Sequence, residues 1–157
     1  MRTIEGTPSA SGLRFAVIVS RYHDFVTDRL EAGATAALAA MGVADGDITV
    51  VHVPGAFEIP IAAQHAALTS RFDAIVCLGC LIRGATPHFE YIASAVSHGL
   101  TAAARLTGVP MAFGVLTTTS IEEAIERAGE GASNKGWEAA AAAVEIATVI
   151  AQVRAKG

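Results

Sequence analysis

Runs of apolar, largely β-branched residues recur four times along the chain. They cover residues 13–20 (LRFAVIVS), 48–54 (ITVVHVP), 73–82 (DAIVCLGCLI) and 109–116 (VPMAFGVL). Because these runs are nearly continuous and do not alternate with polar residues, they predict strands that are buried on both faces. Strands of this kind are typical of parallel sheets that helices cover on each side.

Helical periodicity fills the intervals between these runs. In residues 24–41, for example, Val26, Leu30 and Ala34 repeat on one face. Strands that alternate with helices indicate a parallel sheet, because parallel neighbours need crossover connections that place helices on both faces of the sheet. Further helices are predicted at residues 57–70, 87–107, 120–128 and 134–156.

The predicted fold class is therefore α/β, a three-layer α/β/α sandwich with a four-stranded parallel, flavodoxin-like sheet. We expect residues 1–157 to form one domain, because this length matches a single ordinary domain. Residues 1–12 are expected to be an N-terminal extension that is flexible or pairs with a neighbouring subunit. In such sheets ligands bind beyond the carboxyl ends of the strands, so the residues that follow the four strands should converge in space.

The charge pattern argues against two classes of partner. The chain has 11 basic and 15 acidic residues, a formal net charge of −4 and no basic stripe. A nucleic acid or an anionic membrane therefore has no positively charged surface to bind, and small-molecule chemistry is favoured.

The N-terminus has no apolar signal-peptide core, and no segment reaches the ~20 uninterrupted apolar residues that span a bilayer. The expected location is the cytoplasm.

The apolar content points to self-association. Apolar residues other than glycine make up 52% of the chain, more than the roughly 45–50% that soluble domains reach with glycine included. The C-terminal helix carries Ala and Val around almost its whole circumference, and such a helix is usually buried on several sides. Packing against a second copy of the chain would bury it. A helix that is rich in alanine for helix propensity alone is the alternative.

The pair Cys77 and Cys80 suggests a redox or zinc site by its spacing. Within a strand, however, these residues lie ~10 Å apart on opposite faces, whereas a disulfide needs Cα atoms within ~7 Å. A zinc site needs a second pair of ligands, and the sequence offers none. Both cysteines are therefore interpreted as small buried hydrophobes, and no metal site is expected.

The segment RGATPHFEY, which follows the third strand, has the features of an anion site. Gly84 allows backbone angles that other residues avoid, Thr86 can cap a helix with its hydroxyl, and Pro87 suits a first helical turn. Free N–H groups there would let Ala85 and Thr86 hold a phosphate; a capped helix without a ligand is the alternative. His88 lies on the same turn, and imidazole can transfer protons near neutral pH.

Three other segments carry candidate binding groups. Glu58 opens the helix after the second strand, either as a hydroxyl-binding carboxylate or as a residue that the helix dipole favours. Tyr22 follows the first strand, where an aromatic ring can cover a planar ligand or simply pack. Arg127 and Lys135 flank a turn between helices. The guanidinium of Arg127 can bind a phosphate, and the ammonium group of Lys135 can donate to a carbonyl. The alternative is that both are solvated surface charges without a ligand.

Four segments in this order and spacing, VPGAFEIP, LGCLIRGATPHFEYI, FGVLTTTSIEEAIERAG and SNKGWEAA, closely resemble the lumazine synthase family. The resemblance runs from Leu13 to Arg154, almost the whole chain. It implies the condensation of 5-amino-6-(D-ribitylamino)uracil with 3,4-dihydroxy-2-butanone 4-phosphate to 6,7-dimethyl-8-ribityllumazine, phosphate and water, the penultimate step of riboflavin synthesis. It implies neither a metal nor a redox cofactor.

The resemblance also implies a role for each matching residue. His88 would be the proton donor and acceptor. Phe113 and Arg127 would come from a neighbouring subunit. The phosphate-binding residues would be Gly84, Ala85, Thr86 and Arg127. The residues expected to bind the pyrimidine and the ribityl chain are Tyr22, which would stack on the ring, with Ala56, Phe57, Glu58, Cys80, Leu81, Ile82, Phe113 and Lys135.

Three positions depart from the family's pattern. Tyr22 stands where Phe or Trp is commoner, His23 where Asn is common, and Ser133 where the motif usually has Gly. The first two leave ring stacking feasible but bear on affinity for the pyrimidine, so a flavin- or pyrimidine-binding protein with little turnover is the alternative function. Ser133, together with Gly131 in place of a commonly basic residue, bears on assembly.

The resemblance implies a homopentamer with sites at the subunit interfaces, and twelve pentamers can close into a 60-subunit icosahedral shell. Riboflavin synthase is a further expected partner. The sequence has no long insertion in the turn at residues 127–136, which is compatible with a shell. Pentamer, decamer and shell all stay open. A third hypothesis, compatible with the enzyme, is that the chain serves mainly as a shell subunit.

Overall fold

The computed structural model describes residues 1–155, in which strands and helices alternate as the sequence predicts. Their ends agree with the predicted ends within two residues. The strands are β1 (Phe15–Ser20), β2 (Ile48–Val53), β3 (Ala74–Ile82) and β4 (Met111–Thr118). The α-helices are α1 (Asp24–Ala40), α2 (Ile59–Leu68), α3 (His88–Thr107), α4 (Ile121–Arg127) and α5 (Lys135–Arg154), with short 3-10 helices at Asp45–Asp47, Ala56–Glu58 and Gly131–Ser133.

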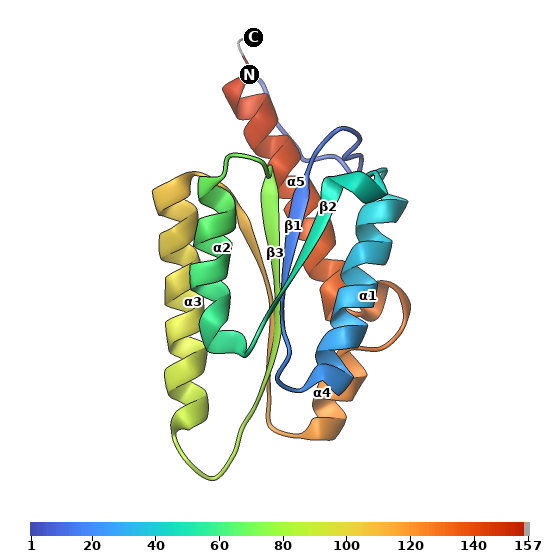
Figure 1. The fold of residues 1–157 in the computed structure, drawn as a ribbon. Coiled ribbons are helices and arrows are strands. Elements are labelled where there is room, and N and C mark those ends of the chain that lie inside the picture. The colour runs from blue at the N-terminus through green and yellow to red at the C-terminus, as the bar shows by residue number, and fades with distance from the viewer. Residues whose placement is uncertain (156–157) are drawn as a thin grey trace.

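The four strands run parallel in the order β2-β1-β3-β4. β1 pairs on both sides, with Phe15 opposite Ile48 of β2 and opposite Ala74 of β3. α2 and α3 cover one face of the sheet, and α1, α4 and α5 lie on the other (Figure 1). The predicted three-layer α/β/α sandwich with a parallel sheet is therefore confirmed.

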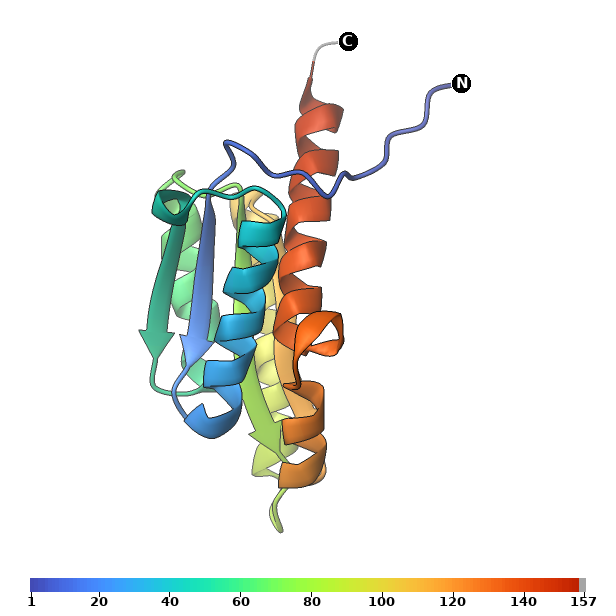
Figure 2. The ribbon, with the colours of Figure 1, turned by 90° about the vertical axis from the view of Figure 1, so that its right-hand side faces the viewer.

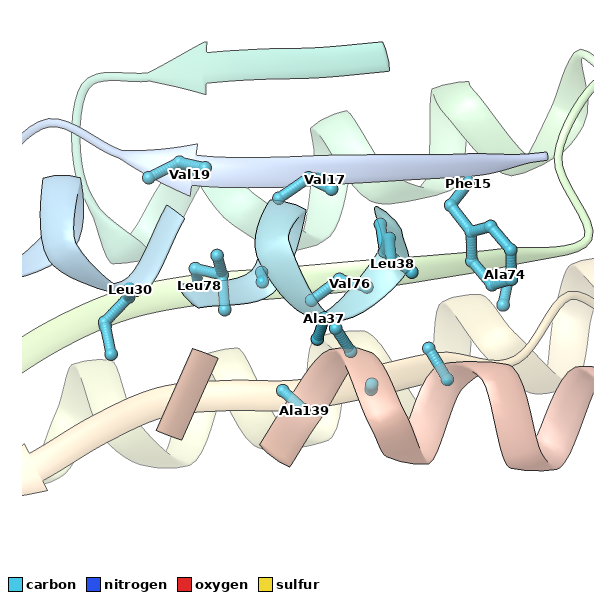
Figure 3. Packing of buried hydrophobic residues seen from close by; sticks show 14 of the residues in the cluster. Phe15, Val17, Val19, Leu30, Ala37, Leu38, Ala74, Val76, Leu78 and Ala139 are labelled. Carbon is cyan, nitrogen blue, oxygen red and sulfur yellow. The ribbon is translucent and has the colours of Figure 1, made fainter. Parts of the chain in front are cut away.

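Two apolar cores, one on each face of the sheet, hold the layers together. Successive residues of β1 point to opposite faces, as the pleat of a strand requires. Phe15 and Val17 join the core beneath α1 and α5, and Ala16 and Ile18 join the core beneath α2 and α3. Figure 3 shows Phe15 and Val17 among their neighbours in the first core. Packing on both faces therefore holds the central strands in place and fixes the position of their carboxyl ends.

The prediction that every apolar run is buried on both faces is wrong for β2. Thr49 and His52 are exposed in this strand, and Ile48 and Val50 are only partly covered. β2 lies at one edge of the sheet, where the flanking helices cover less of each face than they do at the centre. The other edge strand, β4, likewise exposes Phe113.

Small residues let α5 lie close against α1 and the sheet. Ala139, Ala140 and Ala143 are buried on this side of the helix. Gly136 comes so near α1 that a side chain there would collide with the carbonyl of Leu30. The length and hydropathy of α5 would also allow it to cross a membrane, a property that core helices share. Here it packs against α1, β3 and β4.

Residues 1–12 contain no helix or strand and run across α5 (Figure 2). The N–H of Thr7 donates to the hydroxyl of Thr148 (2.9 Å), and the side-chain amide of Gln152 donates to the carbonyl of Glu5 (2.7 Å). In the single chain this segment is therefore bonded to its own last helix. Its pairing with a neighbouring subunit stays a prediction.

Candidate active site

A cavity of about 830 Å³ opens at the carboxyl ends of β1, β2 and β3, where the fold class predicts that ligands bind. Its wall is largely apolar, with the carboxyl group of Glu58 and the imidazole of His88 among its few ionisable groups. The lining residues are Tyr22, His23, Pro54, Gly55, Ala56, Phe57, Glu58, Cys80, Leu81, Ile82, Gly84, Thr86, His88, Phe89, Ile92 and Ile121.

Backbone hydrogen bonds fix the two loops that supply Tyr22 and Glu58. The N–H of Arg21 donates to the carbonyl of Val53 (2.8 Å), and the N–H of Tyr22 donates to the carbonyl of Pro54 (3.1 Å). These bonds continue the pairing of β1 with β2 beyond the strand ends. The 3-10 helix after β2 then brings Glu58 into the same wall. Tyr22 stays 68% exposed, so a planar ligand can reach its ring.

The first turn of α3 has no side-chain cap. The prediction that Thr86 caps this helix is wrong, because Pro87 takes the N-cap position. The carbonyl of Pro87 accepts hydrogen bonds from the N–H groups of Glu90 (3.1 Å) and Tyr91 (3.3 Å). The foremost N–H groups of the helix therefore have no side-chain acceptor and can bind an anion. His88 opens this turn and lines the cavity.

The loop before α3 carries the other candidate phosphate-binding residues. Gly84 and Thr86 line the cavity, and Ala85 lies between them in the same exposed loop, outside the cavity lining. The guanidinium of Arg83 lies 3.0 Å from the carboxylate of Glu90 in the first turn of α3. The loop is therefore tied to the helix by an ion pair at its entrance, although this pair is exposed and contributes little to stability.

Phe113, Arg127 and Lys135 do not line this cavity. They line a second cavity of about 340 Å³, between β4 and the start of α5. Phe113 is 50% exposed there, and the ammonium group of Lys135 donates to the carboxylate of Glu138 (2.8 Å). The structure thus divides the expected site residues into two groups on one chain. That Phe113 and Arg127 serve the site of a neighbouring subunit stays a prediction.

The carboxylate of Glu123 holds the guanidinium of Arg127 in an ion pair one helical turn away. The same carboxylate accepts hydrogen bonds from the N–H (3.0 Å) and the hydroxyl (2.9 Å) of Thr119. The backbone N–H of Thr119, followed by Arg127, lowers the pKa of Glu123 to about 2, so this group is ionised at neutral pH. Ser120 caps the helix by accepting from the N–H of Glu123 (3.1 Å). Arg127 is therefore oriented by α4 before any ligand binds.

Asn134 joins the turn after α4 to α5 and α1. It is 3% exposed and N-caps α5, because its Oδ1 accepts from the N–H groups of Gly136 (2.7 Å) and Trp137 (3.1 Å). Its Nδ2 donates to the carbonyls of Arg29 (3.1 Å) and Gly129 (2.8 Å). All the hydrogen-bonding capacity of this buried amide is used. Lys135 is the next residue, so its backbone is fixed by the same contacts.

The two cysteines are free and buried. Cys77 belongs to the core beneath α2 and α3, and Cys80 belongs to the opposite core. Burial raises the pKa of Cys77 to about 12 and that of Cys80 to about 11. Their interpretation as buried hydrophobes on opposite faces of β3 is confirmed. Within residues 1–155, no three His, Cys, Asp or Glu side chains are grouped so that they could hold a metal ion.

The cavity also contains residues that the sequence analysis did not assign to it. Phe89 and Ile92 also line it; Ile92 lies four positions after His88 and three after Phe89, spacings that place side chains on one side of a helix and could have been used. His23 lies beside Tyr22, and burial lowers its pKa. Ile121 comes from the start of α4, and no local pattern connects it with the other lining residues.

The parallel sheet and the cavity at its carboxyl edge define a small α/β protein of the ligand-binding class, with candidate acid–base and anion-binding groups. A family model described as 6,7-dimethyl-8-ribityllumazine synthase matches residues 12–151. The chain therefore belongs to the 6,7-dimethyl-8-ribityllumazine synthase family of transferases.

Two curated relatives carry this name. The protein from Syntrophus aciditrophicus (strain SB) is 52% identical over 149 residues, which cover 95% of this chain and 97% of the relative. The protein from Desulfatibacillum aliphaticivorans is 50% identical over 153 residues, which cover 98% of this chain and 99% of the relative. The likeness therefore extends over the whole fold and both cavities.

Proposed function

We propose that this chain condenses 5-amino-6-(D-ribitylamino)uracil with 3,4-dihydroxy-2-butanone 4-phosphate to 6,7-dimethyl-8-ribityllumazine, phosphate and water. The observation that carries the proposal is the arrangement of the larger cavity. Its lining combines the exposed Tyr22 and the carboxylate of Glu58 with His88, which opens the uncapped first turn of α3. A pyrimidine carrying a hydroxylated chain and a phosphate ester fit these two groups of residues.

The reaction needs two reactants held together and protons moved between them. The amine of the pyrimidine attacks the ketone, and water leaves as an imine forms. Phosphate then leaves by elimination, and the ring closes with loss of a second water. His88 is the proposed proton donor and acceptor. The protein's further contributions are approximation of the reactants and electrostatic support of the departing phosphate.

The other candidate residues in and around the cavity have proposed parts in binding. Tyr22 stacks on the pyrimidine ring. The carboxylate of Glu58 accepts hydrogen bonds from ribityl hydroxyls or ring N–H groups. The 3-10 helix Ala56–Glu58 and the end of β3, Cys80 to Ile82, form the walls of the pyrimidine pocket. Gly84, Ala85 and Thr86, with the start of α3, hold the phosphate.

We further propose that the site is completed by a second copy of the chain. The lining of the larger cavity contains no lysine or arginine, although cationic side chains strengthen the binding of a phosphate dianion. Arg127 and Lys135 lie in a different surface cavity with the exposed ring of Phe113. Two unlike patches that meet between copies form a heterologous contact, which makes a ring when the rotation between copies closes. A homopentamer is the proposed ring, and a 60-subunit shell is its proposed higher assembly.

The cytoplasm is the proposed location, because the chain belongs to an enzyme family of a biosynthetic pathway. An enzyme that consumes the lumazine, riboflavin synthase, is the proposed protein partner. Both proposals rest on the proposed reaction.

The test of the reaction is direct. Purified protein is mixed with both substrates, and the fluorescence of the lumazine product is followed against the uncatalysed condensation. A rate no faster than the uncatalysed one overturns the proposal. Tight binding of a flavin or of the pyrimidine without turnover would instead support a binding protein on the same scaffold, the alternative to which the Tyr22–His23 pair gives weight. Sedimentation of the same preparation distinguishes pentamer, decamer and shell.

A further inference from the structure

His23 has an unusual backbone conformation at the edge of the larger cavity. Its φ and ψ of 63° and 47° lie in the left-handed region, which is uncommon for residues with a side chain, although histidine is one of the types that tolerate it best. Among the described residues, Ser70 is the only other non-glycine residue with positive φ, and it lies at the end of α2, outside the larger cavity. Such conformations concentrate at functional sites, where surrounding structure imposes them.

The backbone of His23 turns the chain from β1 into α1. His23 is the N-cap of α1, and its carbonyl accepts hydrogen bonds from the N–H groups of Val26 (2.9 Å) and Thr27 (3.1 Å). The sharp turn brings both Tyr22 and His23 into the cavity lining. Glycine or asparagine would make this turn at less or equal cost. The turn therefore accounts for the conformation but not for an imidazole at this position.

The imidazole makes contacts that a glycine or asparagine would lack. Its centroid lies 4.4 Å from that of the Tyr22 ring, with the planes 61° apart, and 5.8 Å from that of the Phe25 ring, at 85°. Both are edge-to-face geometries that aromatic rings favour. Burial lowers the pKa of His23, so near neutral pH the ring is neutral and adds no charge to the cavity.

The contact with His23 restricts the orientation of the Tyr22 ring. The backbone of Tyr22 is fixed by the hydrogen bond to Pro54, but the residue is 68% exposed and its ring would otherwise turn between rotamers. A ring on which a ligand stacks must be held in one orientation before the ligand arrives, since ordering it on binding costs affinity.

We propose that His23 is a positioning residue, whose imidazole holds the Tyr22 ring in the orientation on which the pyrimidine substrate stacks. The inference rests on the proposed function and adds to it a residue that selects for the pyrimidine and not for the butanone phosphate. The effect is confined to ground-state binding of one substrate, because His23 acts through Tyr22 and not on the reacting atoms.

The test uses substitutions that separate the ring from the turn. His23→Asn and His23→Gly both tolerate the left-handed backbone and both remove the ring. Each is expected to raise the KM for 5-amino-6-(D-ribitylamino)uracil about two- to tenfold, the range of one aromatic pair. The kcat should stay within about twofold, and the KM for 3,4-dihydroxy-2-butanone 4-phosphate should not change, since a ring contact affects only the pyrimidine.

Two further variants control for strain. His23→Ala should show the same rise in KM together with a lower Tm, because alanine lacks both the ring and the tolerance for positive φ. Ser70→Gly relieves the strain of the other positive φ, outside the cavity, so it should change Tm while both KM values stay unchanged. If His23→Asn and His23→Gly keep the KM of the unmodified chain and only His23→Ala is impaired, the inference is overturned, and His23 serves the turn alone.

Equilibrium titration of each variant with 5-amino-6-(D-ribitylamino)uracil alone separates this inference from the proposed reaction. If the unmodified chain binds the pyrimidine without turnover, the reaction fails, and the order of the dissociation constants still decides the role of His23. Equal dissociation constants for the unmodified chain and His23→Asn overturn the inference, and so does the absence of pyrimidine binding to the unmodified chain.

Discussion

The side-chain amide of Asn134 fills the space in which a side chain at Gly33 would lie, so a Cβ at Gly33 would collide with it. The same amide donates to the carbonyls of Arg29 in α1 and Gly129 in the turn after α4. One buried side chain therefore joins the helix that follows Tyr22 to the turn that separates Arg127 from Lys135. The backbone around both cations is fixed from within the chain.

This contact predicts a coupling between the two positions. Asn134→Ala should lower the free energy of unfolding by about 2–4 kcal/mol, because α5 loses its cap and two carbonyls lose their donor. Gly33→Ala alone should also destabilise, through the collision. In the Asn134→Ala background, however, Gly33→Ala should be neutral or stabilising by up to about 1 kcal/mol, since the space is free and alanine favours the helix.

Urea unfolding of the two single variants and the double variant measures this coupling. Additive effects would show that Gly33 and Asn134 do not share the space. Gly46 provides a control, because a Cβ there meets no atom within 4 Å and Gly46→Ala should have the same small effect in both backgrounds.

The thiols of Cys77 and Cys80 should be unreactive in the folded protein. With pKa values of about 12 and 11, each is almost wholly protonated at pH 8, and the thiolate is the reactive form. Labelling with a thiol reagent at pH 8 should therefore be slow until urea unfolds the chain, when both cysteines react. Rapid labelling of Cys80 in the folded protein would contradict this, and would indicate that the cavity wall opens.

Much of the fold and part of the site could be predicted from local pattern. The four apolar runs identified a parallel sheet, and a parallel sheet has its ligand site at the carboxyl edge, where Glu58 and His88 do lie. What could not be predicted depends on contacts between distant parts of the chain. The exposure of β2 follows from its place at the sheet edge, and strand order leaves no local mark.

The same distinction holds for single residues. The capping role expected of Thr86 failed because α3 begins one residue later than local preference predicts: that preference favours Thr as the N-cap and Pro at the first helical position, whereas Pro87 is the N-cap. Asn134 is a recognisable helix cap, but its partner at Arg29 lies 105 positions earlier in the chain. Ile121 enters the cavity only because α4 follows β4 beneath the carboxyl edge of the sheet.

For His88, we expect a moderate effect on turnover. His88→Ala should lower kcat by about 10²-fold or less, the low end of the ~10²–10⁴-fold that acid–base catalysis typically contributes, because approximation of the reactants remains. Steady-state kinetics with both substrates measures the change, and His98→Ala, on an exposed part of the same helix, is the matched control. A loss far above ~10⁴-fold would indicate that His88 does more than transfer protons.

The division of site residues between two cavities predicts complementation between chains. Arg127→Ala should raise the KM for the butanone phosphate, and His88→Ala should lower kcat, so each homogeneous assembly has only defective sites. If a site combines His88 of one chain with Arg127 of its neighbour, random co-assembly of equal amounts of the two variants makes about one quarter of the sites intact. At low concentrations of the phosphate substrate, the mixed assembly should then show about a quarter of the activity of the unmodified protein. If both residues served the same chain's site, no intact site would form, and the mixture would be no more active than the average of the two variants assayed alone.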